Sequence, residues 1–207
     1  MLNCDMADDL RPSPRLIASL CARYAEPQRA YHTLAHIEAC LDLLAEQAEL
    51  SDQERRLLTY AIWWHDAVYD PLRQDNEEQS AELARADLAT LCAPQETIEE
   101  VARLILLTKG HAVPAGDRLG ALLVSIDLAI LGANPADYDV YAHAIRREYG
   151  FVPDALYRAG RAKVLRHFLD AETIFPDGLL RQRYEAQARA NLARELAALE
   201  RGEALPG

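Results

Sequence analysis

Residues 119–131 read LGALLVSIDLAIL, and this stretch indicates the fold of the chain most directly. Its side chains are apolar almost all the way round a helix of 3.6 residues per turn, a pattern typical of a helix that is buried on every side. Asp127 is the single charged residue within it. We therefore expect a central helix that lies in the core and carries one carboxylate.

The rest of the chain is also predicted to be helical. Glycine is scarce, with 9 in 207 residues, and few runs alternate between apolar and polar residues as strands do. Prolines fall between segments rich in Ala, Leu and Glu, where they mark the ends of helices. We predict an all-α fold, a single helical bundle of about eight to nine helices that forms one domain over residues 1–207, with 1–12 loose. The predicted helices cover residues 14–26, 34–49, 52–68, 75–91, 95–108, 117–131, 135–149, 154–171 and 178–200.

Capping residues support several of these helix starts. Ser51 and Asp52 precede an apolar-periodic run, with Glu54 close behind them. Asn134 followed by Pro135 is typical of an N-cap with proline at the first helical position.

The chain is strongly acidic, with a formal net charge of -11. Such a chain has no general attraction for nucleic acids or for anionic membrane surfaces. A small anionic substrate stays compatible with it, because a bound dication and a few arginines can reverse the sign of the charge locally. The charge therefore argues against a nucleic-acid scaffold and against a membrane partner, and it leaves nucleotides open as substrates.

The four cysteines are scattered, and no two of them form a CxxC pair. A zinc ribbon and a thioredoxin-like redox motif are therefore not indicated, and reduced, mostly buried thiols are expected. The N-terminal segment is polar and acidic, unlike a signal peptide. No stretch approaches the roughly 18 consecutive apolar residues of a membrane span, so we expect a cytoplasmic protein.

Residues 31–37 read YHTLAHI, which places His32 and His36 four residues apart. Two side chains at this spacing on a helix share one face, so both imidazoles can reach one cleft. Alone the pair is a weak signal, because 6 histidines in the chain make such a spacing by chance unsurprising.

Residues 61–70 read AIWWHDAVYD, in which an apolar run leads directly into His65 and Asp66. An aspartate among aromatic and aliphatic residues needs a partner, and a dication is a natural one. The alternative is an aspartate at a helix end beside a core histidine. Asp127 raises the same question, because its carboxylate in so apolar a helix needs either a metal ion or a buried arginine.

Together, three predicted helices supply His36, the doublet of His65 and Asp66, and Asp127. Imidazole and carboxylate ligands suit Mn, Mg, Ni, Fe, Co or Zn and leave positions for water and substrate. This order of a histidine, a His-Asp doublet and a distant aspartate resembles the HD superfamily. The resemblance implies that these four residues bind a divalent metal ion.

The YHTLAHI segment is similar to the Tyr-His-Asn-x-x-His segment of cyclic-nucleotide phosphodiesterases, which are also HD proteins. In those enzymes the first histidine is the general acid and the second binds metal. The resemblance implies that His36 is a ligand and that His32 donates a proton to the leaving group. His32 and Asp66 are accordingly the expected catalytic residues.

A closer resemblance spans roughly residues 15–200 and is to a bacterial family of predicted metal-dependent HD phosphohydrolases. The motifs that carry it are Arg29-x-Tyr31-His32 through His36-Ile37, His65-Asp66-x-Val68-Tyr69-Asp70, Asn76-Glu77-Glu78-x-Ser80-Ala81, Asp127-Leu128-x-Ile130-Leu131-Gly132, Ile145-Arg146-x-Glu148-Tyr149 and Asn191-Leu192-x-x-Glu195-Leu196. The family often has an acidic residue two positions before the ligand aspartate. This chain has Ser125 there, so no metal role is implied for that position.

This resemblance implies an HD-type phosphoric ester hydrolase. A metal-activated water would attack the phosphate ester of a nucleotide or of a related small phosphate compound.

Five further residues are candidates for contacts to the substrate or to the metal ligands. Arg29 is a candidate phosphate contact. Asp70, Asn76 and Glu77 follow the His-Asp helix and begin the next one, where they either orient the ligands or only cap the helix and form a turn. His111 follows an apolar helix and is a candidate for a second metal or for substrate phosphate, with an ordinary loop histidine as the alternative.

Two other functions stay open at this point. One is a non-catalytic nucleotide-binding or signalling module on an HD fold, and the other is a diiron HD oxygenase, which needs more histidine ligands than this set supplies. The final predicted helix, rich in Ala, Arg and Glu, is typical of a surface or oligomer helix, and a homodimer is compatible with it.

Overall fold

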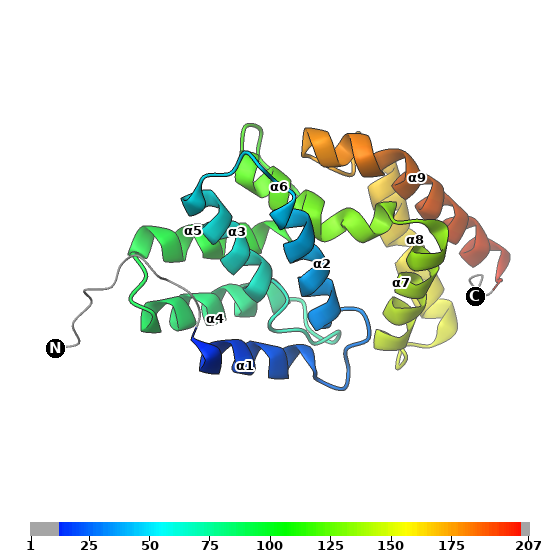
Figure 1. Ribbon diagram of the computed structural model, residues 1–207. Coiled ribbons are helices and arrows are strands. Elements are labelled where there is room, and N and C mark those ends of the chain that lie inside the picture. The colour runs from blue at the N-terminus through cyan, green and yellow to red at the C-terminus, as the bar shows by residue number, and fades with distance from the viewer. Residues whose placement is uncertain (1–12, 204–207) are drawn as a thin grey trace. The chain divides into compact units, whose positions relative to one another are not determined.

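The computed structural model describes residues 13–203, and this part of the chain forms nine α-helices and one short 3₁₀-helix, without any strand (Figure 1). The all-α prediction is therefore confirmed. The predicted loose segment 1–12 lies outside the described residues. The elements in chain order are α1 (Pro14–Tyr24), α2 (Leu34–Ala45), α3 (Asp52–Trp64), α4 (Asn76–Thr90), α5 (Gln95–Leu107), α6 (Arg118–Asp127), η1 (Leu128–Gly132), α7 (Pro135–Glu148), α8 (Asp154–Asp170) and α9 (Gly178–Arg201).

The chain folds into two compact units, which divide between Ala112 and Val113. The first contains α1 to α5, and the second contains α6, η1 and α7 to α9. The single-domain organisation that the sequence suggests stays a prediction, and each unit is described by itself.

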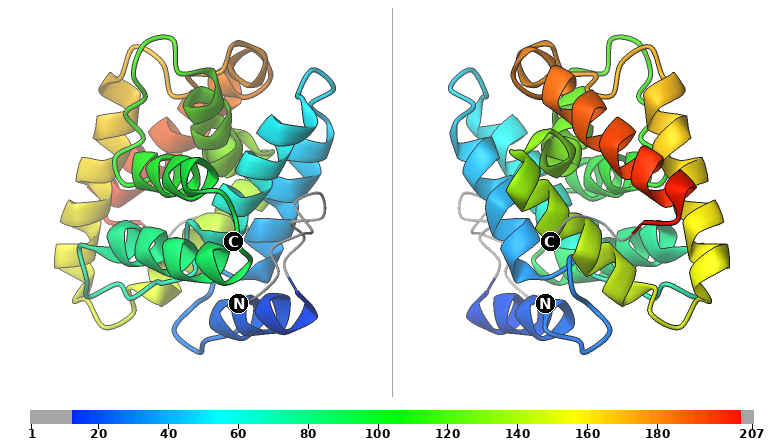
Figure 2. Two further views of the ribbon diagram at one scale, coloured as in Figure 1. Left: turned by 90° about the vertical axis from the view of Figure 1, so that its left-hand side faces the viewer. Right: turned by 90° about the vertical axis from the view of Figure 1, so that its right-hand side faces the viewer.

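Helix α3 is the centre of the first unit, because it packs against α2, α4 and α5. Helices α4 and α5 form a hairpin and lie side by side (Figure 2). The indole nitrogen of Trp64 donates a 2.9 Å hydrogen bond to a carboxylate oxygen of Asp87, which joins the end of α3 to α4. Large apolar or aromatic side chains that are fully buried here are Leu20, Tyr24, Ile37, Leu58, Tyr60, Ile62, Trp64, Leu88, Leu104 and Ile105.

Both ends of α3 are set by identifiable hydrogen bonds. At its start Ser51 and Glu54 form a reciprocal capping box, which confirms the predicted start signal. The helix ends at Trp64, earlier than the predicted end at 68, because tertiary partners take the next backbone groups. The N–H of Val68 donates to the hydroxyl of Ser80 at 3.0 Å, and that hydroxyl donates back to the carbonyl of Val68 at 3.3 Å. His65 and Asp66 therefore lie at the exit of the helix.

Helix α9 organises the second unit by packing against α8, η1 and α6. The side-chain amide of Asn191 donates to the carbonyl oxygens of Leu131 and Ala133, at 2.9 and 2.8 Å. A buried ion pair links α8 to α9, because Arg161 donates to both carboxylate oxygens of Glu195, at 2.8 and 3.0 Å. These buried polar contacts join the helices at defined positions.

The apolar stretch 119–131 is largely buried, as predicted, but it is not one continuous helix. Helix α6 ends at Asp127, and residues 128–132 continue as the tighter η1. This segment lies close against α9: a side chain on Gly132 would meet Tyr184 at 2.5 Å, and Asn191 donates to the carbonyl of Leu131. Asp127 thus stands where the helix changes geometry.

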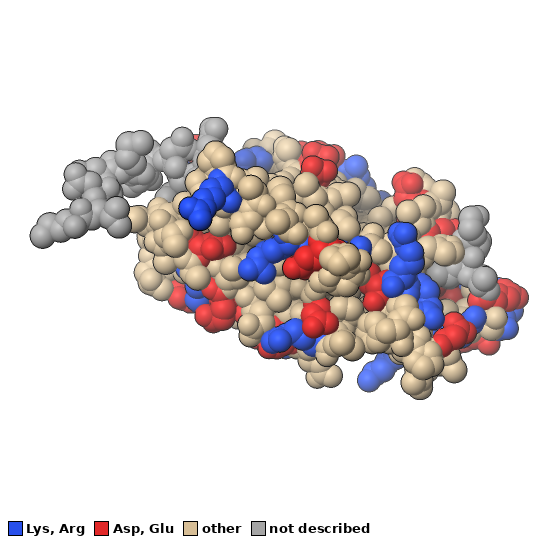
Figure 3. Space-filling view, turned by 90° about the horizontal axis from the view of Figure 1, so that it is seen from below, with Lys and Arg blue, Asp and Glu red and all other residues tan. Residues whose placement is uncertain are grey.

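Among residues 13–203, no single helix is both long and apolar enough to cross a membrane; by length and composition alone, one bent pair, 118–132 with 135–148, could. Acidic and basic side chains are interspersed on the face drawn in Figure 3. Cys21, Cys40 and Cys92 are free thiols, as expected for reduced cysteines, and Cys4 lies outside the described residues. The expectation that the thiols are mostly buried is wrong for these three, because only Cys40 is buried, while Cys21 is half-buried and Cys92 is exposed.

Candidate metal centre

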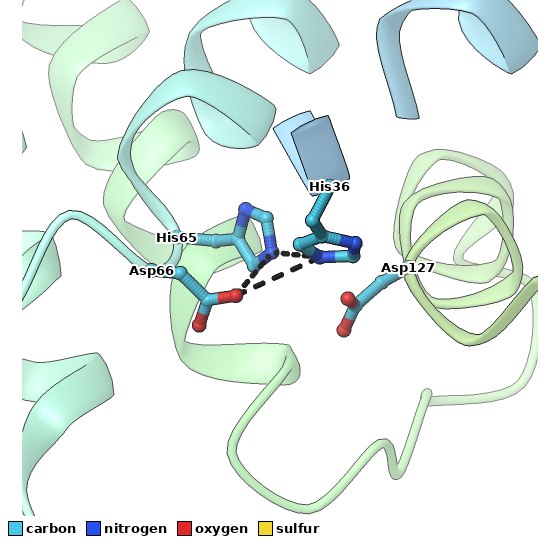
Figure 4. A group of neighbouring side chains, drawn as sticks. All are labelled: His36, His65, Asp66 and Asp127. Carbon is cyan, nitrogen blue, oxygen red and sulfur yellow. Dashed lines mark hydrogen bonds and ion pairs between the residues drawn. The ribbon is translucent and has the colours of Figure 1, made fainter. Parts of the chain in front are cut away.

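The first unit brings three of the predicted ligands together around one point. His36 comes from α2, while His65 and Asp66 come from the exit of α3 (Figure 4). The Nε2 atoms of the two histidines lie 3.3 Å apart. The Oδ2 atom of Asp66 lies 3.0 Å from Nε2 of His65 and 3.6 Å from Nε2 of His36. Three donor atoms from two separate segments thus face a common centre.

These donor atoms suit a divalent metal ion. The imidazoles are almost fully buried, with 4% of the His36 side chain and 2% of the His65 side chain exposed, whereas 19% of the Asp66 side chain is exposed. Two ring nitrogens and a carboxylate oxygen are the ligand types that Mn, Fe, Co, Ni and Zn accept. The partial exposure of Asp66 leaves a path from solvent. The chemistry of the donor set therefore fits the predicted metal ion.

The far nitrogen of each imidazole is held in place by a second residue. Nδ1 of His65 lies 2.8 Å from the carbonyl oxygen of Ile62, so this nitrogen must carry the proton and donate it. Nδ1 of His36 lies 3.0 Å from the hydroxyl of Tyr31. Both contacts orient the rings, and wherever Nδ1 carries the proton the lone pair of Nε2 is left for a metal. The sequence motif contains Tyr31, but the spacing alone assigned it no role.

Arg29 supports the segment that carries Asp66. Its Nη1 donates to the carbonyl oxygen of Asp66 at 2.8 Å, and its Nη2 donates to that of Ala67 at 3.2 Å. Its Nε pairs with Glu26 at 3.1 Å, and none of the Arg29 side chain is exposed. The phosphate contact expected for Arg29 is therefore corrected: all three guanidinium nitrogens are bound to protein groups, away from solvent.

His32 lies beside the cluster, but not by the route that the sequence suggested. Helix α2 begins at Leu34, so His32 precedes it, and the argument that His32 and His36 share a helix face is wrong. A bend in the chain brings the two rings to a centroid distance of 6.2 Å instead. The ring of His32 stacks on Tyr69 with centroids 4.1 Å apart. His32 is half-buried, so solvent reaches it.

Asp70 and Asn76 bond to each other between the end of α3 and the start of α4. The N–H of Asp70 donates to Oδ1 of Asn76 at 3.1 Å, and Nδ2 of Asn76 donates to the carbonyl of Asp70 at 2.9 Å. A carboxylate oxygen of Asp70 also accepts from the N–H of Leu72 at 2.9 Å. These contacts fit the turn-forming alternative. Glu77 is half-buried in the first turn of α4.

His111 follows α5, as predicted, and adopts a left-handed backbone conformation with φ 55°. Its N–H donates to the carbonyl of Leu107 at 3.0 Å, and its side chain is half-buried. The neighbouring Lys109 donates to Glu78 and, at 2.8 Å, to the carbonyl of Gln74. The Lys109 ammonium lowers the pKa of the Glu78 carboxyl. Lys109 therefore joins the end of α5 to the start of α4.

Asp127 belongs to the second unit, where it is the last residue of α6 and half-buried; Figure 4 draws it with the three residues of the first unit. Ser125, two positions earlier, is fully buried, and its hydroxyl accepts a 2.9 Å hydrogen bond from the N–H of Asp177. Asp177 is the N-cap of α9, so Ser125 supports a helix start.

One neighbour of the cluster was missed by reasoning from sequence. The thiol of Cys40 lies 3.8 Å from Nδ1 of His36, one helical turn further along α2. The four-residue spacing was available in the sequence, but an isolated cysteine on an apolar face is more simply a core residue.

Comparison with known proteins found no family model, no curated protein and no solved structure that matches this chain significantly.

Proposed function

We propose that this chain is a metal-dependent phosphohydrolase of the HD type, which hydrolyses the phosphate ester of a nucleotide or of a related small phosphate compound. The observation that supports this most is the convergence of His36 Nε2, His65 Nε2 and Asp66 Oδ2 within 3.6 Å of one another. The order of these residues in the sequence resembles that of HD proteins, and this resemblance is the ground for proposing phosphate ester hydrolysis as the reaction. We propose that the protein acts in the cytoplasm and has no nucleic-acid or membrane partner. A homodimer is compatible with this proposal.

The proposal takes Asp127 as the fourth ligand. Its carboxylate matches the donor type, it ends the largely apolar helix α6, and its place in the sequence is that of the distant aspartate in the HD resemblance. A divalent ion held by this set would supply Lewis-acid chemistry, which lowers the pKa of water and polarises a phosphoryl oxygen.

The residues around the ligands have separate tasks in this proposal. His32 is the proton donor to the leaving alkoxide, because it is half-exposed and lies near the ring of His36, and imidazole side chains commonly act as general acids. Stacking on Tyr69 restricts its ring to one plane. Asp66 binds the ion and, as the most exposed of the three ligands in the first unit, faces the approaching substrate.

The test begins with the metal content of the purified protein, measured by mass spectrometry after reconstitution with Mn²⁺, Mg²⁺, Ni²⁺ or Co²⁺. Each form is then assayed against nucleoside mono-, di-, tri- and cyclic phosphates. We expect bound metal and release of phosphate or opening of a cyclic phosphate. Tight nucleotide binding with no turnover in any metal would instead favour a signalling module, and bound iron with oxygen consumption would favour an oxygenase.

Variants assign the ligands. His65→Ala and Asp66→Ala should remove bound metal and activity together, and Asp127→Asn should weaken metal binding in the same assay. His143→Ala is the matched control, because this exposed histidine lies on α7 and bonds only locally, to the carbonyl of Asp139 at 2.7 Å. Full metal content in Asp127→Asn would remove Asp127 from the ligand set and leave the other three in place.

A further inference from the structure

We propose that Arg29 is a positioning residue, which holds the proton donor His32 and the ligand Asp66 at a fixed separation through a single guanidinium group. This inference rests on the proposed function. It replaces the phosphate contact that the sequence suggested with a role inside the fold.

The geometry of one nitrogen carries the proposal. Nη1 of Arg29 donates to the carbonyl of His32 at 3.0 Å and to the carbonyl of Asp66 at 2.8 Å. These two residues are 34 positions apart in the chain, and each carries a side chain with its own proposed task. Both backbones are therefore fastened to the same atom, so the donor and the ligand cannot shift independently.

Aromatic rings hold the guanidinium from its sides. Its carbon lies 5.2 Å from the ring centroid of Tyr24 and 5.5 Å from that of Tyr69. The hydroxyl of Tyr24 donates to the carbonyl of Trp63 at 2.8 Å, next to the exit of α3. Tyr69 is the ring on which His32 stacks. Arg29 is thus linked to His32 in two ways. It donates directly to the backbone carbonyl of His32, and both side chains lie against the ring of Tyr69.

The arrangement requires arginine rather than any cation. A guanidinium is planar and presents five N–H groups in a fixed fork, whereas lysine offers one compact ammonium. Here the guanidinium of Arg29 donates to three backbone carbonyls and to the carboxylate of Glu26. The side chain has no exposed surface, so water does not replace a lost donor. Lysine at this position would leave buried carbonyls without partners.

A positioning role and a phosphate contact predict different kinetics. Loss of a phosphate contact raises KM, and lysine partly replaces it as a point charge. Loss of the fork moves Asp66 and His32, so Arg29→Lys and Arg29→Ala should both lower kcat by about 100-fold with little change in KM. Both should also weaken Mn²⁺ binding, by about 10- to 100-fold.

Chemical rescue separates positioning from a general loss of stability. Arg29→Ala leaves a buried space lined by carbonyls and tyrosine rings, into which a free guanidinium ion fits. About 20 mM guanidinium chloride, far below the molar range that unfolds proteins, should restore most of the Mn²⁺ affinity and of kcat. The same concentration of ammonium chloride should restore neither.

Arg55→Ala is the matched control within the same unit. Arg55 also donates to two backbone carbonyls, those of Leu44 and Gln47, at the end of α2 away from the ligands. Its loss should lower stability without changing Mn²⁺ affinity or the ratio of kcat to KM, and guanidinium should have no effect on either.

Amide hydrogen exchange tests the positioning role without activity or metal. In Arg29→Ala the amides of His65, Ala67 and Val68 should exchange faster, and guanidinium should slow them again. If Arg29→Ala shows faster exchange that guanidinium reverses, while the wild-type protein binds no Mn²⁺, the proposed function is overturned and the role of Arg29 is upheld. Unchanged exchange, or a raised KM that lysine corrects, would overturn the role of Arg29 whatever the protein catalyses.

Discussion

The hydroxyl of Tyr31 lies 3.0 Å from Nδ1 of His36, across the ring from the nitrogen that faces His65 and Asp66. The hydroxyl can accept a proton from Nδ1 of His36, and this is the direction that a metal ion on Nε2 requires. A hydroxyl that accepts from Nδ1–H leaves the lone pair on Nε2, where the other donor atoms converge.

Tyr31→Phe should therefore weaken metal binding by about 10-fold or more while the fold is retained. Competition with a fluorescent chelator measures the affinity for Mn²⁺ or Zn²⁺. Tyr157→Phe is the control, because it removes a tyrosine hydroxyl in the second unit that has no hydrogen-bond partner among the described residues. Equal affinities in the two variants would contradict the orienting role of Tyr31.

His32→Ala tests the division of labour between the two histidines of the YHTLAHI segment. The variant should keep its metal, because the ring of His32 lies 6.2 Å from that of His36 and outside the ligand set. Turnover should fall by about 10²- to 10⁴-fold, the usual contribution of a general acid. Metal analysis beside a single-turnover assay checks both parts. A metal-free His32→Ala would show that His32 is itself a ligand.

Burial raises the pKa of Tyr157 to about 12, and its hydroxyl has no hydrogen-bond partner within the described residues. The folded state therefore holds the proton more tightly than the unfolded chain, whose tyrosines titrate near about 10. The stability that this adds is complete below the unfolded pKa and is lost as pH rises toward the folded pKa.

Tyr157→Phe should accordingly be as stable as the wild type near neutral pH, or up to about 1 kcal/mol more stable, because no hydrogen bond is lost. Between about pH 10 and 12 it should lose less stability than the wild type. Urea denaturation at about pH 7 and about pH 11 measures the difference. Burial also raises the pKa of Tyr138, which is present in both proteins and cancels in the comparison. Parallel pH profiles would refute the assignment to Tyr157.

Gly132 tests the packing of η1 against α9. A Cβ atom on Gly132 would lie 2.5 Å from Cβ of Tyr184 and 2.7 Å from its carbonyl oxygen, and backbone atoms cannot move aside cheaply. Gly132→Ala should therefore destabilise the protein by about 1–3 kcal/mol.

Gly160→Ala is the matched substitution for this prediction. Gly160 lies within α8, and an added Cβ would meet nothing within 4 Å. Alanine there should stabilise the protein by about 0.5–1 kcal/mol, since it favours the helix and restricts the unfolded chain. Thermal or urea unfolding of the two variants should show opposite signs. Equal effects would mean that η1 and α9 do not approach each other as described.

The amino-acid sequence by itself determined the fold class and the residue types of the candidate site. Helical periodicity and capping boxes are local properties, so the order of the helices and the start of α3 at Ser51 and Asp52 could be predicted. The His-Asp doublet in an apolar run likewise indicated buried polar chemistry, because such groups need a partner wherever they fold.

Only the tertiary structure decided where α3 ends and how the side chains around it are used. Ser80 takes the backbone groups of Val68, and Arg29 takes the carbonyls of His32 and Asp66, from positions far away in the sequence. Where a helix ends depends on whether its backbone groups bond to the next turn or to such distant partners. The local sequence does not show which of the two forms. For the same reason Arg29, which as a lone arginine suggested a phosphate contact, is a buried support for the residues that carry the proposed chemistry.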